Sequence, residues 1–243
     1  MAYWSKRSRH EQAWDWLLNE LRPDIALCQE CVPPDWVSRE RTVLWERAYP
    51  PDSKQSWGTA VVSSLPTTEA RLPELDDWLE ALPSYVPGKE QLAGIHRADG
   101  WLQCAQIELP RIGPVLTGSL HNPSYPIERG RLESVNVSDI KLKNNNDVWF
   151  IDVLFYFLKR RLDRPLLVGG DFNTSRLLDD LHGNNGNHEF FDRIAAEGFV
   201  SLHRTSRSTR PATCGLERVD ASREDSATPS SAPKRGMTSL TCP

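Results

Sequence analysis

Apolar residues recur along the chain in two patterns, a helical spacing in some segments and short continuous runs in others. The first pattern puts apolar side chains on one face of a helix, and the second is typical of buried strands. We predict helices over residues 10–21, 150–158 and 188–197, and another that Thr174 or Ser175 caps and that runs through Leu181. Residues 72–82 fit either a helix or part of a long excursion. We predict strands over residues 25–28, 57–64, 101–109, 115–120, 166–168 and 199–202.

The order of these segments indicates an α/β protein built in layers. Near the start, a helix is followed by a Pro-Asp break and then by a strand that ends in an acid. Residues 101–109 and 115–120 flank a Pro/Gly turn, which predicts an antiparallel hairpin. A hairpin argues against a purely parallel, doubly wound sheet.

Length and charge restrict the domain organisation and the function only weakly. The 243 residues allow one large domain or two small ones. The formal net charge is -4, so no general positive field marks a nucleic-acid-binding protein. From Arg204 onward apolar residues become rare and aromatic residues are absent, so this segment buries too little apolar surface to fold.

The sequence gives no indication of a membrane or an oxidising compartment. Its opening residues run into charge without the apolar core of a signal peptide. The longest apolar run, residues 148–158, is too short to span a bilayer, so we expect no membrane partner. Five cysteines do not suggest a disulfide framework, and Cys28 and Cys31 form a single Cys-x-x-Cys without a second pair. We expect a cytoplasmic protein.

Asp171 and Asn173 follow a buried run and two glycines. In an extended chain, residues two apart point to the same face, so a carboxylate and an amide would project side by side. Gly169 and Gly170 leave room for backbone or ligand to come close. A carboxylate that activates water beside an amide that holds a phosphate oxygen suits metal-assisted hydrolysis. The alternative is a polar turn between strand and helix, where Asp and Asn are common for turn chemistry alone.

Two other predicted strands also end in groups capable of chemistry. Glu30 follows residues 25–28, and its oxygen atoms suit Mg²⁺; a surface acid at a loop start is the alternative. His121 follows residues 115–120 and could bind a phosphoryl oxygen or shuttle a proton. Its alternative is a hydrogen-bonded turn residue.

Four motifs at strand ends, in this order, resemble the endonuclease/exonuclease/phosphatase superfamily. They are residues 23–30 (PDIALCQE), 58–63 (GTAVVS), 119–121 (SLH) and 170–173 (GDFN). The resemblance implies a four-layer α/β sandwich, with two mixed β-sheets packed face to face and helices outside. It implies that Glu30 binds Mg²⁺, or Mn²⁺ as the alternative, and that His121 contacts the scissile phosphate. It further implies that Asp171 orients or deprotonates the attacking water and that Asn173 holds a phosphate oxygen.

Two parts of the family pattern have no clear counterpart. The family's first strand, which ends in Trp-Asn, has no equivalent before Trp4, and no histidine follows His203 to match its final Ser-Asp-His. Asp220 is the nearest substitute for the late aspartate. We therefore expect an incomplete domain over residues 1–203, truncated at both ends, and a disordered or out-of-register tail over 204–243.

The resemblance implies a divalent-metal-dependent hydrolase of phosphoester bonds, with nucleic acid among the candidate substrates. Because the terminal Asp/His motif is missing, two other functions stay open. One is an inactive remnant that binds a metal or a phosphate, and the other is a structural fragment without a site.

Overall fold

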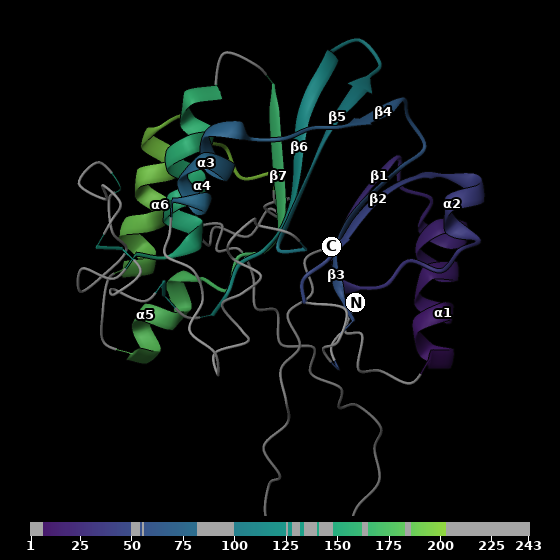
Figure 1. The fold of residues 1–243 in the computed structure, drawn as a ribbon, viewed down its shortest axis with the longest axis horizontal. Helices are drawn as coiled ribbons and strands as arrows, with labels where there is room; N and C mark the ends of the chain where they lie inside the picture. Colours follow the sequence, from purple (N-terminus) through teal and green to yellow (C-terminus); the bar gives the residue numbers. More distant parts are fainter. Residues whose placement is uncertain are drawn as a thin grey trace, which may run out of the picture.

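Two β-sheets lie face to face, with helices covering their outer sides. The computed structural model describes residues 7–49, 54, 56–81, 100–124, 126–127, 132–133, 140, 148–161, 165–182 and 186–202. Figure 1 shows α1 and α2 outside one sheet, and α3, α4 and α6 outside the other. The predicted α/β sandwich is therefore confirmed.

The first sheet has three described strands in the order β1-β3-β2, namely β1 (Ile25–Cys31), β3 (Gly58–Ser63) and β2 (Thr42–Arg47). Both pairings are antiparallel. Its outer face carries α1 (Arg7–Asp15), a π-helical continuation η1 (Trp16–Leu21) and the short α2 (Val37–Glu40). Trp14 and Leu18, both predicted for the apolar face of this helix, are buried against the sheet.

The second sheet runs β4-β5-β6-β7, with β4 (Thr67–Glu69), β5 (Leu102–Leu109), β6 (Gly113–His121) and β7 (Leu166–Asp171). Strands β5 and β6 form the predicted antiparallel hairpin, whereas β6 and β7 pair in parallel. Of the two described sheets, only this one is mixed, because the first is antiparallel throughout.

Helices α3 (Pro73–Glu80), α4 (Phe150–Leu158) and α6 (Gly186–Ala196) cover the second sheet, and α5 (Arg176–His182) follows β7. A 3-10 turn, η4 (Lys159–Arg161), extends α4. Helix α4 is buried along almost its whole length, which is why its sequence is apolar on nearly every side. Among the described helices, none is long and apolar enough to cross a membrane.

The two sheets meet through a thin layer of small and branched side chains, with Val61, Ala105 and Ile107 fully buried between them. At one end of this layer the sheets come very close. A Cβ on Gly169 would lie 2.8 Å from Cδ1 of Leu27, so β7 and β1 touch at this position.

Residues 199–202 do not form the predicted strand. Phe199 instead packs its ring against Phe155 of α4, with centroids 4.9 Å apart, while Val200 and Leu202 are exposed. A short apolar run is equally compatible with a segment outside any sheet, of which one residue packs against a helix, and this is what the chain forms. The tail predicted over residues 204–243 lies outside the described residues.

Candidate functional site

The ends of β1, β6 and β7 meet at one edge of the sandwich. Gln29 in β1 donates from Nε2 to Oγ of Ser119 in β6, at 2.9 Å, and Ser119 donates in turn to the carbonyl of Cys28. Gly170 in β7 has a φ of +138°, and a Cβ there would lie 2.0 Å from the carbonyl oxygen of Leu120. Glycine is therefore required where the two backbones press together, as the sequence predicted.

Glu30 lies in an irregularity of β1, where the pairing with β3 shifts between Cys28 and Cys31. Its backbone is left-handed, with φ of +50°, which is unusual for a residue with a side chain. The bulge re-aims this half-buried side chain. Burial raises the pKa of the Glu30 carboxyl, and the negative charge of Asp171 raises it further. Glu30 and Asp171 therefore share one electrostatic environment.

His121 is the last residue of β6 and stands opposite Asp171 in the parallel pairing with β7. Its side chain is buried, with 7% of the residue exposed. Burial lowers the pKa of His121, while the charge of Asp171 acts in the opposite direction. The imidazole is therefore held largely neutral at neutral pH. Its Nδ1 atom is buried, and no described residue hydrogen-bonds to it.

Asp171 and Asn173 are close together, but not because the strand continues. The chain turns after Asp171, and Asn173 adopts a left-handed backbone with φ of +44°. The Asn173 amide donates to Oδ1 of Asp171 at 2.9 Å, which is the Asx-type turn weighed as the alternative. The prediction that alternation in an extended chain brings them together is thus wrong, although both side chains lie at the site. Ser175 caps the following helix, because its Oγ accepts from the Leu177 amide.

Asn122 is a site residue that the sequence interpretation did not select. It is fully buried, and its amide donates to the carbonyl of Asp171 at 2.7 Å. Its Nδ2 donates to the carbonyl of Phe172 at 2.9 Å, and its own carbonyl accepts from Nδ2 of Asn173 at 2.5 Å. One residue after β6 therefore holds all three residues of the turn after β7. Its place directly after His121 at a strand end was the available signal.

Three aromatic residues beside His121 were also missed. Trp57 and Trp101 lie with ring centroids 5.0 and 5.2 Å from the His121 ring, and Tyr49 packs on Trp57 at 5.0 Å. Burial raises the pKa of Tyr49, and the charge of Glu30 raises it further. One side of the site is therefore aromatic, and the acidic groups lie at its border.

The donor chemistry at this edge suits a hard divalent cation. Glu30 contributes a half-buried carboxylate, and the carboxylate of Asp171 acts electrostatically on it. Mg²⁺ commonly binds through one or two carboxylates and keeps several of its waters. Within the described ranges there is no group of three or more His, Cys, Asp or Glu side chains able to hold a metal ion.

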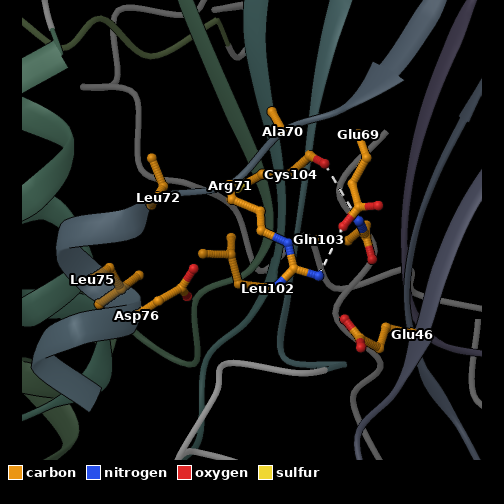
Figure 2. Close-up of a pocket in the computed structure, with 10 residues that line it drawn as sticks. All are labelled: Glu46, Glu69, Ala70, Arg71, Leu72, Leu75, Asp76, Leu102, Gln103 and Cys104. Atoms are coloured by element: carbon orange, nitrogen blue, oxygen red, sulfur yellow. Dashed lines mark hydrogen bonds and ion pairs between the residues drawn. The ribbon is translucent and has the colours of Figure 1, made fainter. Parts of the chain in front are cut away.

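A separate hollow lies among β2, β4, α3 and β5 (Figure 2). Its lining includes the acids Glu46, Glu69 and Asp76 and one base, Arg71, which pairs with Glu69 at 3.1 Å. This excess of negative charge opposes a phosphate group, so the hollow does not compete with the strand-end site for a phosphoester.

A family model described as "Endonuclease/Exonuclease/phosphatase family" matches residues 5–220 of the chain. No curated protein and no solved structure gives a significant match. The matched range includes every residue of the site at the ends of β1, β6 and β7.

Proposed function

The chain belongs to the endonuclease/exonuclease/phosphatase family, and we propose from that membership that it hydrolyses phosphoester bonds with the aid of a divalent cation. Mg²⁺ is the proposed ion, with Mn²⁺ as the alternative, because the available donors are oxygen atoms. The observation that carries the proposal is the meeting of Glu30, His121 and Asp171 at one edge, supplied by three strands from both sheets.

In this proposal Glu30 holds the cation, which when bound supplies Lewis-acid stabilisation of charge on the phosphoryl group. Asp171 orients the attacking water and takes its proton. Its Oδ1 accepts from the Asn173 amide, which leaves the second carboxylate oxygen to act on the water.

His121 and Asn173 are proposed to hold phosphoryl oxygens. A neutral imidazole carries one N–H donor. The Asn173 side-chain amide has two N–H groups, one of which is used on the carbonyl of Asn122. The other is left for a substrate oxygen. Donors fixed in this way stabilise the charge that develops during hydrolysis without having to reorganise.

Hydrolysis assays test the proposal. Purified protein is incubated with a generic phosphodiester, plasmid DNA and RNA, with Mg²⁺ and with EDTA. We expect Mg²⁺-dependent hydrolysis of at least one substrate and a loss on the order of 10²–10⁴-fold in Asp171→Asn. The exposed Asp180 gives the matched control Asp180→Asn, which should keep full activity. Equal rates in wild type and Asp171→Asn would reject the proposal.

Cation binding is measured separately from turnover. Calorimetric titration with Mg²⁺ should show binding to the wild type and weakened binding to Glu30→Gln. Binding without hydrolysis on every substrate would identify the inactive, metal-binding remnant. Nucleic acid is the first substrate class that we propose to test, because the family includes nucleases by its description.

A cytoplasmic location also stays a proposal. Cys28, Cys31 and Cys104 are free and buried, which is compatible with a reducing compartment. Burial raises the pKa of Cys28 to about 11 and that of Cys104 to about 12, so both thiols stay protonated and unreactive.

A further inference from the structure

Two tryptophans pack against the His121 imidazole, and we call this pair, Trp57 and Trp101, the indole clamp. The Trp57 ring is tilted by 40° to the His121 ring and the Trp101 ring by 65°. The two indoles also pack on each other, with centroids 5.5 Å apart and planes at 77°. Both are almost completely buried, at 6% and 3% exposure. The imidazole is thus in contact with aromatic surface from two directions.

The backbone fixes both tryptophans in place. The His121 amide donates to the carbonyl of Trp101 at 2.7 Å, and the Ala48 amide donates to the carbonyl of Trp57 at 3.0 Å. Each tryptophan also has a glycine neighbour where the chain is crowded. A Cβ on Gly58 would lie 1.7 Å from the carbonyl oxygen of Glu46, and one on Gly100 would lie 2.1 Å from the Ala48 amide nitrogen. The rings are therefore carried by backbone that has little freedom to move.

A histidine ring needs such support to keep one orientation. Rotation about the bond between Cβ and the imidazole has broad, roughly two-fold minima, so an unsupported ring samples both. Exchange between them swaps the positions of nitrogen and carbon atoms. Beside His121, both indole rings lie in contact with the imidazole, and Nδ1 is buried. Nε2 is then the nitrogen left for a phosphoryl oxygen.

We propose that Trp57 and Trp101 are positioning residues, which hold the His121 imidazole in one orientation and so keep Nε2 available to the phosphoryl group. The catalytic consequence rests on the proposed function, whereas the orientation itself does not. The alternative is that the two indoles are ordinary core side chains whose loss lowers stability without acting through His121. The two interpretations differ in what happens to the histidine ring and in how the variants combine.

The first test observes the ring directly and needs no activity. In proton–carbon NMR spectra of the histidine rings, His121→Gln assigns the His121 signal among the six histidines. We expect one sharp signal in the wild type, which broadens or splits in Trp57→Leu and in Trp101→Leu as the ring exchanges between its two orientations. Trp16→Leu removes an exposed tryptophan and should leave the signal in place.

Phenylalanine variants keep this test decisive where a leucine variant does not fold. Trp57→Phe and Trp101→Phe retain an aromatic wall, so we expect a single sharp signal. A single sharp His121 signal in the folded leucine variants, or a broadened signal in both phenylalanine variants, would overturn the proposal.

The second test asks whether the tryptophans act through His121. We expect Trp57→Leu to lower kcat about tenfold with little change in KM, and to have no further effect when His121→Gln is already present. Equal factors in both backgrounds would show a general structural effect and overturn the proposal. If the wild type hydrolyses nothing, the proposed function fails, and the NMR result still decides whether the clamp orients His121.

Discussion

Asn122 shows how much of the site depends on one buried amide. Its side chain donates to the carbonyls of Phe172 and Pro123, at 2.9 and 3.1 Å, while its backbone binds both Asp171 and Asn173. The backbone contacts survive any substitution that leaves the chain in place, but the side-chain contacts do not. The turn that carries the candidate catalytic groups is therefore partly fixed by a residue on a different strand.

Replacing Asn122 by alanine should cost about 2 kcal/mol of folding free energy, because the carbonyls of Phe172 and Pro123 lose their donor and a small void remains. Urea unfolding followed by tryptophan fluorescence measures this loss. Asn19→Ala is the matched control, since Asn19 is exposed and its side chain bonds only to its helix neighbour Asp15 in the described contacts. It should change stability by less than about 0.5 kcal/mol. Similar losses in the two variants would contradict the assigned role of Asn122.

At the scale of elements, Asp179 joins α5 to α6. Its Oδ1 accepts from the backbone and side-chain amides of Asn187, and its Oδ2 accepts from the backbone and Nδ1 of His188. The carboxylate thus caps the N-terminus of α6, where negative charge is favoured. Burial alone would raise the pKa of Asp179, but these four hydrogen bonds outweigh it and lower the pKa.

Asp179→Ala should destabilise the protein by about 3 kcal/mol at neutral pH, because the end of α6 loses its charged acceptor. A lowered folded pKa means that this contribution is complete above the unfolded pKa, near 3.8, and is lost as pH falls through the folded value. Urea midpoints measured from pH 7 down to about pH 2 should therefore show a constant gap between wild type and variant above about pH 4, which narrows below it. Asp180→Ala, at the exposed next position, should show neither effect. A gap that stays constant with pH would exclude the ionised carboxylate as its source.

Elements with a long, regular apolar pattern could be predicted, and short segments could not. The stripe through Leu154 and Phe157 predicted α4 correctly, since only a helix brings those positions onto one buried face. The run at 199–202 failed because four residues cannot distinguish a strand from a chain that rests on a helix. Strand β2 went unpredicted, and all of its residues are only partly buried, so it lacks the contrast between buried and exposed positions that marks most strands.

From the sequence, site residues could be selected only by their residue type and by their position at the end of a predicted strand. Asp171 was selected from the Asp/Asn pair after an apolar run, whereas Glu30 and His121 were selected because their strand ends resemble the family motifs. The structure places them together, while their chemical roles remain proposals. The left-handed turn at Asn173 could not be predicted from alternation, which holds only while the strand continues. Trp57 and Trp101 could not be selected either, because nothing in the sequence distinguishes a buried tryptophan beside a site from one in an ordinary hydrophobic core.

At the scale of the whole molecule, each sheet contributes one carboxylate to the edge where the two sheets meet. Glu30 belongs to the first sheet and Asp171 to the second, and each sheet is covered by its own helices. Because burial and the charge of Asp171 raise the folded pKa of Glu30, the folded state binds the Glu30 proton more tightly than the unfolded state does. The contribution of the Glu30 carboxyl to the free energy of unfolding is therefore complete below its unfolded pKa. It is lost as pH rises through the folded pKa. Near neutral pH, packing the sheets together therefore has an electrostatic cost that a cation would remove.

Thermal unfolding with and without Mg²⁺ tests this coupling between the sheets. At about 100 times its dissociation constant, a cation that binds only the folded state adds about 2.7 kcal/mol of stability. For a chain of this size that raises Tm by roughly 5–10 °C. In Glu30→Gln the increase should be much smaller, while the cation-free variant should be at least as stable as wild type at pH 7, because the repelled charge is gone. Glu20→Gln, on an exposed helix position, should behave as wild type in both conditions. An equal rise in Tm for Glu30→Gln would place the cation elsewhere, and then the acid at the end of β1 would be a surface carboxylate rather than a metal ligand.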